Sequence, residues 1–319
     1  GHGQPHKRAH RRRPERLRGG PIDVGLTGAT GHLGSRLLPR LLDDPSITQI
    51  RSVARRPLGS WAGHSKIVHT EADLRDDDAR RALEGVDVLW HLCFALWQGG
   101  DSAHLNLDGT RNVLAARPGR VILASSVAVY GAWPDNPIPL SEDHWPRPNP
   151  ECPYASQKLT AERLCREAAP TTVLRIAAAL GPHADPSIQR ATLGYRRAVP
   201  AIRAVTQAVQ FLDEDDAASA LHVAGSLGPA GVFNIAPPDW LNERDIARLA
   251  GSRVVRLPAK AVVRASNIAF RLGLLPFGAD RAILINGPMA VDATKASEEL
   301  GWRATHGSAE VLSAALSRG

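Results

Sequence analysis

The stretch TGATGHLG, residues 27–34, determines how the first part of the chain folds. It follows an apolar run, PIDVGL, that is typical of a buried strand, and it leads into HLGSRLLPRLLDD, whose apolar residues have helical spacing. Its glycines Gly28, Gly31 and Gly34 recur at every third residue. Glycine allows a tight turn and a close approach of the backbone to phosphate, and the start of a helix attracts an anion. The stretch therefore predicts the phosphate-binding turn of a dinucleotide-binding fold.

Strand-like and helix-like segments alternate along the chain from this stretch to residue 180. After the first strand and helix come strand patterns at 47–54, 66–74, 86–93, 120–126 and 171–179, with helix patterns at 77–85, 103–116 and 154–168. This order predicts an α/β protein with a doubly wound, Rossmann-type parallel sheet. The second half is less regular. It predicts a strand and a helix in 209–226, a strand in 231–237, and a mostly helical pattern from Trp240 onward.

The segment order predicts three parts along the chain. Residues 1–20 form a disordered basic tail, since they hold seven cations against Glu15 and almost no apolar side chain. Residues 21–180, with a return near 207–236, form the Rossmann domain. Residues 181–206 and 237–319 form a smaller, mostly helical domain for the substrate.

The composition limits the class of partner and the compartment. The formal net charge is +7, and the tail supplies most of it, so we expect no nucleic-acid partner for the folded body. No apolar run reaches the roughly 18 residues that span a bilayer, which predicts no membrane partner. The three cysteines and the scattered histidines show no metal-ligand spacing, which indicates a reduced, cytoplasmic protein without a metal site.

The ends of the second and third strands indicate which dinucleotide binds. An acidic residue near the end of the second strand usually holds the ribose 2′-hydroxyl of NAD. Arg55 and Arg56 stand there instead, and arginine can clamp a 2′-phosphate. We therefore expect NADP(H), with NAD(H) as the alternative. Asp73 and Leu74, at the end of the third strand, are placed to contact the adenine edge.

The motif PYASQK, residues 153–158, places Tyr154 and Lys158 one helical turn apart, so both side chains can face one cleft. The motif alone is weak, because such pairs also occur as surface groups. Ser126, at the carboxyl end of the fifth strand, is the candidate for a third polar group beside a nicotinamide.

Taken together, the chain resembles the extended short-chain dehydrogenases/reductases, the NAD-dependent epimerase/dehydratase family. The resemblance runs from Ile22 to Trp302 and rests on the motifs TGATGHLG, DLRD, NLDGTRNVL, SSVAVYG, YASQK, LRIAAALGP, FLDEDDAASAL, FNIA and VDATKASEELGW. It implies that Tyr154 is the general acid/base, that Lys158 binds the nicotinamide ribose and lowers the pKa of the phenol, and that Ser126 hydrogen-bonds the substrate oxygen.

The resemblance also implies further contacts and an assembly. The cofactor-binding residues are expected to be the three glycines and Lys158 with Thr27, Thr30, His32, Leu33, Arg55, Arg56, Asp73, Leu74, Leu92 and Cys93. A homodimer through the helices at 101–117 and 154–168 is expected. One departure bears on the substrate. Many nucleotide-sugar members carry Asn three residues after the arginine that corresponds to Arg175, whereas this chain has Ala178.

Aromatic residues near the expected site could line an apolar pocket for a small-molecule substrate, or could pack the domain interface instead; they are Phe94, Trp97, Trp133 and Trp145. The leading hypothesis is an oxidoreductase that interconverts a carbonyl and an alcohol on a small, hydrophobic substrate. A nucleotide-sugar epimerase or dehydratase is the second. A non-catalytic NADP-sensing regulator is the third, and a sensor has no need of the Ser126, Tyr154 and Lys158 set.

Overall fold

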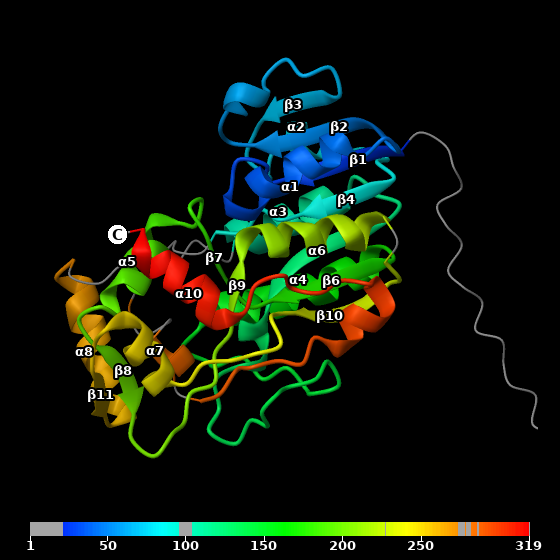
Figure 1. The fold of residues 1–319 in the computed structure, drawn as a ribbon. Helices are drawn as coiled ribbons and strands as arrows, with labels where there is room; N and C mark the ends of the chain where they lie inside the picture. Colours follow the sequence, from blue (N-terminus) through cyan, green and yellow to red (C-terminus); the bar gives the residue numbers. More distant parts are fainter. Residues whose placement is uncertain are drawn as a thin grey trace, which may run out of the picture.

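The centre of the molecule is a seven-stranded parallel sheet with the strand order β10-β6-β5-β4-β1-β2-β3 (Figure 1). The computed structural model describes residues 22–95, 104–226, 228–273, 278, 282–285 and 287–318. The strands are β1 (Ile22–Thr27), β2 (Ile47–Ala54), β3 (Ile67–Glu71), β4 (Val88–His91), β5 (Val121–Ser126), β6 (Thr171–Ile176) and β10 (Gly231–Ile235). The predicted Rossmann-type doubly wound sheet is confirmed.

Helices cover both faces of this sheet. Successive residues of a strand point to opposite faces, so each strand contributes side chains to two apolar clusters. On β5, Ile122 and Ala124 join one apolar cluster, whereas Val121 and Leu123 join the other. The first cluster includes α1 (His32–Asp43) and α6 (Glu214–Ser226). The second includes α2 (Asp77–Ala82), α3 (Gly109–Leu114) and α4 (Pro153–Ala168). The strands are therefore apolar on both faces, as expected for a buried parallel sheet.

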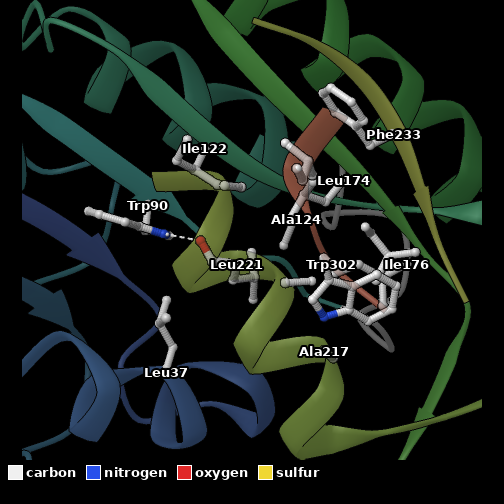
Figure 2. Packing of buried hydrophobic residues seen from close by; sticks show 14 of the residues in the cluster. Leu37, Trp90, Ile122, Ala124, Leu174, Ile176, Ala217, Leu221, Phe233 and Trp302 are labelled. Atoms are coloured by element: carbon white, nitrogen blue, oxygen red, sulfur yellow. Dashed lines mark hydrogen bonds between the residues drawn. The ribbon is translucent and has the colours of Figure 1, made fainter. Parts of the chain in front are cut away.

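The first cluster is closed by two tryptophans that pack against α6 (Figure 2). Trp90 of β4 donates its indole N–H to the carbonyl of Leu221 at 2.8 Å. Trp302, from far along the chain, is 4% exposed and donates to the hydroxyl of Ser219 at 2.8 Å. Each indole thus buries its ring and still satisfies its donor. The two contacts hold α6 against the sheet through one residue that precedes the helix in the sequence and one that follows it.

The remaining elements gather mainly at one side of the sheet (Figure 1). They are β7 (Ala178–Leu180), α5 (Pro186–Gly194), β8 (Val199–Ile202), β9 (Phe211–Asp213), α7 (Glu243–Ala250), β11 (Val254–Leu257), α8 (Ala259–Arg271) and α10 (Ser308–Ser317). Short helical turns connect elements elsewhere in the molecule; they are η1 (Gly59–Trp61), η2 (His104–Asp108), η3 (Val127–Tyr130), η4 (Ile283–Ile285) and η5 (Ala296–Leu300). Two small parallel sheets pair β7 with β9 and β8 with β11.

Some local expectations differ from the structure. The predicted helix over 103–116 begins as the π-helical turn η2, and the strand pattern at 171–179 divides into β6 and β7 after Ile176. The mostly helical pattern after Trp240 contains the strand β11, which pairs with β8. The predicted domain boundaries stay a prediction. Trp302 belongs to the range assigned to the substrate domain, yet it packs in the core of the main sheet.

Candidate active site

The glycine loop between β1 and α1 is built so tightly that side chains would not fit. Gly28 has a φ of +79°, and a Cβ there would lie 2.9 Å from the backbone nitrogen of Cys93. A Cβ on Gly34 would lie 2.0 Å from the carbonyl oxygen of Gly28. Gly31 is the N-cap of α1 and supplies no side-chain cap, and the first turn of the helix has no acidic residue. The first N–H groups of α1 are therefore left for an anion, which fits the pyrophosphate of a dinucleotide.

A directed chain of hydrogen bonds holds this loop to its neighbours. The hydroxyl of Thr110 donates to the carbonyl of Asn106 at 2.6 Å, so its oxygen accepts from Nε2 of His91 at 2.9 Å. Nδ1 of His91 is then free to accept from the hydroxyl of Thr27 at 2.8 Å. The oxygen of Thr27 accepts in turn from the backbone N–H of Leu92. Burial lowers the pKa of His91 to about 3, so the ring stays neutral and keeps this direction.

Asn106 extends the network to α4. Its side-chain oxygen accepts from the backbone N–H of Ala95 at 2.7 Å, and its amide N–H donates to the side-chain oxygen of Gln157 at 2.7 Å. Gln157 directly precedes Lys158. Asn106 thus positions the segment after β4 and the helix of the candidate catalytic residues at the same time. The sequence reasoning missed this role, although the four-residue spacing of Asn106 and Thr110 in NLDGTRNVL offered a signal.

Tyr154 and Lys158 lie one turn apart at the start of α4, where Pro153 occupies the first turn without loss of a helix hydrogen bond. The Lys158 side chain is buried, and its Nζ donates to the carbonyl of Ala124 at 2.6 Å. The ammonium lies 3.9 Å from the ring centre of Phe94 and 5.7 Å from that of Tyr154. The Lys158 ammonium thus lies over both aromatic rings.

Ser126 reaches the same place from β5. It ends the strand two residues after Ala124, the acceptor of Lys158, and its hydroxyl oxygen accepts from the N–H of Ala128 at 3.2 Å. Ala128 belongs to the small apolar cluster against which Tyr154 packs. The structure therefore brings together the three residues predicted to be catalytic, two on α4 and one at the carboxyl end of β5.

Residues 24–236 match the NAD dependent epimerase/dehydratase family. The chain belongs to this family. It is 25% identical over 316 residues to the uncharacterized protein y4nG of Sinorhizobium fredii, which covers 90% of this chain and 76% of the relative. It is 38% identical over 130 residues to sterol demethylase protein B of Methylococcus capsulatus, which covers 38% of each.

Among solved structures, MoeE5 in complex with UDP-glucuronic acid and NAD has a TM-score of 0.69, with 24% sequence identity over 91% of this chain and 96% of that chain. At this identity the likeness shows the epimerase/dehydratase fold. The positions of the candidate site residues are therefore taken from the structure of this chain.

Two arginines follow β2, and the second of them, Arg56, contacts the glycine loop. It donates to the carbonyl of Thr30 at 2.9 Å, and both arginines are exposed. Asp73, expected at the adenine edge, binds the Arg75 guanidinium at 2.9 Å, and this hydrogen bond lowers the pKa of its carboxyl group. Arg56 is thus held beside the loop, and Arg55 is accessible for a ligand phosphate.

Two more of the residues expected to bind the cofactor contact the same loop. The backbone N–H groups of Leu92 and Cys93 both donate to the Thr27 hydroxyl, and burial raises the pKa of the Cys93 thiol. Leu74 is buried in the second apolar cluster, and Leu33 packs against the first. The contact of these four residues with a cofactor stays a prediction.

His32, the residue after Gly31, has a partner that sequence reasoning did not anticipate. Its Nε2 lies 2.9 Å from the Glu214 carboxylate, which also binds Nδ1 of His183 at 2.6 Å. Burial lowers the pKa of His32, against the opposing effect of Glu214. The buried Glu214 side chain therefore ties the cofactor loop to the segment after β7. The sequence separation of 182 residues explains why no local pattern indicated the contact.

A buried ion pair connects α4, which carries Tyr154 and Lys158, to the sheet. The Arg175 guanidinium of β6 meets Glu162 of α4 at 2.8 Å, with both side chains almost fully buried. The hydroxyl of Ser125 donates to the same carboxylate at 2.6 Å. A buried carboxylate is stable only when its oxygens are satisfied in this way. The pair fixes α4, and with it Tyr154 and Lys158, against β5 and β6.

The aromatic residues expected to line the substrate pocket lie in different surroundings. The Phe94 ring meets that of Tyr154 edge-on, with 5.8 Å between the ring centres. Trp133 donates to the carbonyl of Arg147 and stacks under its guanidinium. Trp145 is 84% exposed, and Trp97 lies outside the described residues. Phe94 is therefore the aromatic residue that the structure places against the candidate catalytic groups.

Proposed function

We propose that the protein is an NAD(P)-dependent oxidoreductase that interconverts a carbonyl and an alcohol on a small, hydrophobic substrate. The observation that carries the proposal is the apolar setting of Tyr154. Its phenol ring packs against Phe94 and against a cluster of Ala128, Cys152, Ala155 and Ile283. An apolar wall with a few convergent polar groups is typical of a site for a small, hydrophobic molecule. The match to part of a sterol demethylase protein B is consistent with this substrate class.

The roles of the chain's own residues follow from their positions. Ser126 donates a hydrogen bond to the substrate oxygen from the end of β5. Tyr154 passes a proton to that oxygen, or takes it back in the reverse direction. Lys158 lowers the pKa of the phenol from its ordinary value of about 10 toward working pH, where proton transfer is most effective. The bound nicotinamide dinucleotide supplies or accepts the hydride.

For the cofactor itself we propose NADP(H), held at the 2′-phosphate by Arg55 and Arg56, with NAD(H) as the alternative. The absence of an acidic residue after β2 supports this preference. The glycine loop and the uncapped start of α1 suit the pyrophosphate of either cofactor.

A second function has support from the comparisons. MoeE5 was solved with UDP-glucuronic acid and NAD, so a nucleotide-sugar epimerase or dehydratase is the competing proposal. Against it stands Ala178, which lacks the amide that many such enzymes place there. A methyl group cannot hydrogen-bond a pyrophosphate oxygen.

One experiment separates the two functions. The protein is offered NADPH or NADH with a panel of apolar ketones and aldehydes, and separately NAD with UDP-sugars. Net consumption of reduced cofactor with a ketone, abolished by Tyr154→Phe, is the expected result. Conversion of a UDP-sugar without net change in nicotinamide absorbance, together with no activity on the ketones, would replace the proposal with the second function.

A further inference from the structure

Several apolar side chains of α8 are exposed to solvent. Ile268 and Leu272, which lie four residues apart on one side of the helix, are 52% and 67% exposed, and Phe270, on the other side, is 52% exposed, whereas Val262 on the inner face is 5% exposed. Along the helix, Ala261, Ala265, Ile268 and Leu272 recur at spacings that place them in one stripe. An apolar stripe that faces outward is typical of a helix that contacts something besides water.

The same helix carries positive charge and no negative charge. Lys260, Arg264 and Arg271 are all exposed, and within the described part of the chain none of them forms an ion pair. The sequence has no acidic residue from position 246 to position 279. By contrast, Arg256 just before the helix is neutralised by Glu243. The exposed surface of α8 thus places cations that form no ion pair in the described part of the chain next to a stripe of apolar side chains.

We propose that this face of α8 lies on an anionic lipid bilayer surface. A basic amphipathic helix binds such a surface by inserting its apolar side chains at the level of the headgroups and pairing its cations with lipid phosphates. A second copy of the chain fits less well, because a symmetric contact would bring two sets of unpaired cations together. The unpaired cations favour a negatively charged partner, and the apolar stripe favours a partner with a hydrophobic interior. An anionic bilayer has both properties.

This proposal replaces one expectation from the sequence. The expectation of no membrane partner rested on the lack of a spanning segment, and in the described part of the chain no helix is long and apolar enough to cross a bilayer. A helix that lies in the interface needs no spanning length.

The inner face of α8 connects this surface to the candidate active site. Val263 packs against the cluster of Ala128, Cys152, Ala155 and Ile283, which also contacts Tyr154. The helix therefore lies between the proposed bilayer surface and the catalytic tyrosine. A hydrophobic substrate dissolved in the bilayer would reach the protein at this face. Binding to lipid does not require the proposed reaction, so the two proposals fail separately.

The test is co-sedimentation of the full chain with vesicles of phosphatidylcholine, with and without phosphatidylglycerol. We expect binding to the anionic vesicles and little to the neutral ones. Replacing Lys260, Arg264 and Arg271 with Gln should weaken binding by roughly 100-fold, since each cation near an anionic surface contributes about 1 kcal/mol, or about fivefold. Replacing Ile268, Phe270 and Leu272 with Ser should also weaken it.

Two matched controls make the test specific. Arg11, Arg12 and Arg13 in the basic tail are replaced with Gln, which removes the same charge. Val68, 50% exposed on β3, is replaced with Ser, which removes an exposed apolar group elsewhere. Both controls should keep the α8-dependent binding. Equal binding by the α8 variants and the parent chain, or loss of binding only in the tail variant, would overturn the proposal.

The same variants are checked for folding and for assembly. Unchanged unfolding midpoints would show that weakened binding comes from the surface and not from loss of structure. If the chain binds no vesicles but forms a dimer in sedimentation equilibrium that the Ile268, Phe270 and Leu272 replacement dissociates, the occupant of the face is a second copy and the proposal is wrong.

Discussion

At the carboxyl edge of the main sheet, polar side chains from separate elements hold one another, whereas on the outer face of α8 the charges and apolar groups meet solvent. Lys158 is buried and bound to Ala124, and His91 lies between two threonine hydroxyls. Arg264 on α8 is exposed and has no ion-pair partner among the described residues. A substitution at the sheet edge therefore disturbs several neighbours, and one on α8 changes mainly what the protein associates with.

The largest effect is expected at Tyr154. Tyr154→Phe keeps the ring and its contact with Phe94 and removes the hydroxyl, so turnover should fall by roughly two to four decades, the usual weight of a general acid/base. Cofactor affinity should barely change. Single-turnover hydride transfer, followed by nicotinamide absorbance, measures the rate.

Lys158→Met provides the contrast, because under the proposal it would remove both a contact with the nicotinamide ribose and the charge that lowers the pKa of the phenol. Both rate and affinity should fall. Equal rates in the parent chain and Tyr154→Phe would remove Tyr154 from the mechanism and favour a sensor.

The next effect concerns the choice of cofactor. If Arg55 and Arg56 bind a 2′-phosphate, NADPH should bind more tightly than NADH by roughly 10- to 150-fold, which corresponds to a charge-assisted contact of about 1.5–3 kcal/mol. Replacing both arginines with Gln should bring the ratio close to one. Fluorescence titration with each cofactor measures it. Equal affinities in the parent chain would assign NAD(H) as the cofactor.

The glycine loop should tolerate no side chain at Gly34. Gly34→Ala would place a Cβ 2.0 Å from the carbonyl oxygen of Gly28, and backbone atoms there cannot swing aside. We expect a loss of roughly 1–3 kcal/mol in the free energy of unfolding, as for an overpacked core. Denaturant unfolding is the measurement.

Gly194→Ala is the matched control, since a Cβ at the end of α5 meets nothing within 4 Å. It should raise the free energy of unfolding by about 0.5–1 kcal/mol. A cost at Gly34 no larger than the change at Gly194 would show that the loop is less rigid than described.

His91 gives the sheet edge a dependence on pH. Its pKa is about 3 in the folded state and about 6.5 in the unfolded chain, so between these values only the unfolded state takes up the proton. The free energy of unfolding should therefore fall as the pH falls, by about 2 kcal/mol between pH 7 and pH 5 from this residue. His91→Gln should lack that share of the slope. Parallel slopes for the two proteins would contradict a buried, neutral His91.

The smallest effect is expected on α8. Replacing Ile268, Phe270 and Leu272 with Ser should change the free energy of unfolding by no more than about 0.5 kcal/mol, as for exposed positions. Turnover of a water-soluble substrate should also be unaltered. Thermal unfolding and steady-state kinetics measure the two quantities. A large loss of stability would mean that this face packs within the protein, and the contrast with the sheet edge would disappear.

The sequence allowed prediction of the main sheet because its signals are local. A strand, a glycine turn and a helix follow one another within residues 22–43, and β2 spans the residues that its apolar pattern indicates. β8 and β11 escaped prediction because their four residues are interrupted by Pro200 and by Arg256, whereas the equally short β4 lies within a longer apolar run. A short run with such an interruption cannot be distinguished from a loop.

The site residues also fall into those indicated by a local pattern and those whose contacts join distant parts of the sequence. Tyr154 and Lys158 share a helix turn, so their spacing predicted a common face. The contacts of His91 with Thr27 and of His32 with Glu214 join residues 64 and 182 positions apart. Such pairs are created by the packing of elements, and no periodicity along the chain encodes them.

Trp302 has a consequence for the order of events during biosynthesis. Its indole fills the core that β1 begins, and it donates a hydrogen bond to Ser219 of α6. About 275 residues separate Thr27 from Trp302, so at 5–20 residues per second a ribosome needs roughly 14–55 s to supply the closing side chain. During that interval the nascent sheet carries an uncovered apolar patch beside α6. This core can therefore be completed only after Trp302 has been made.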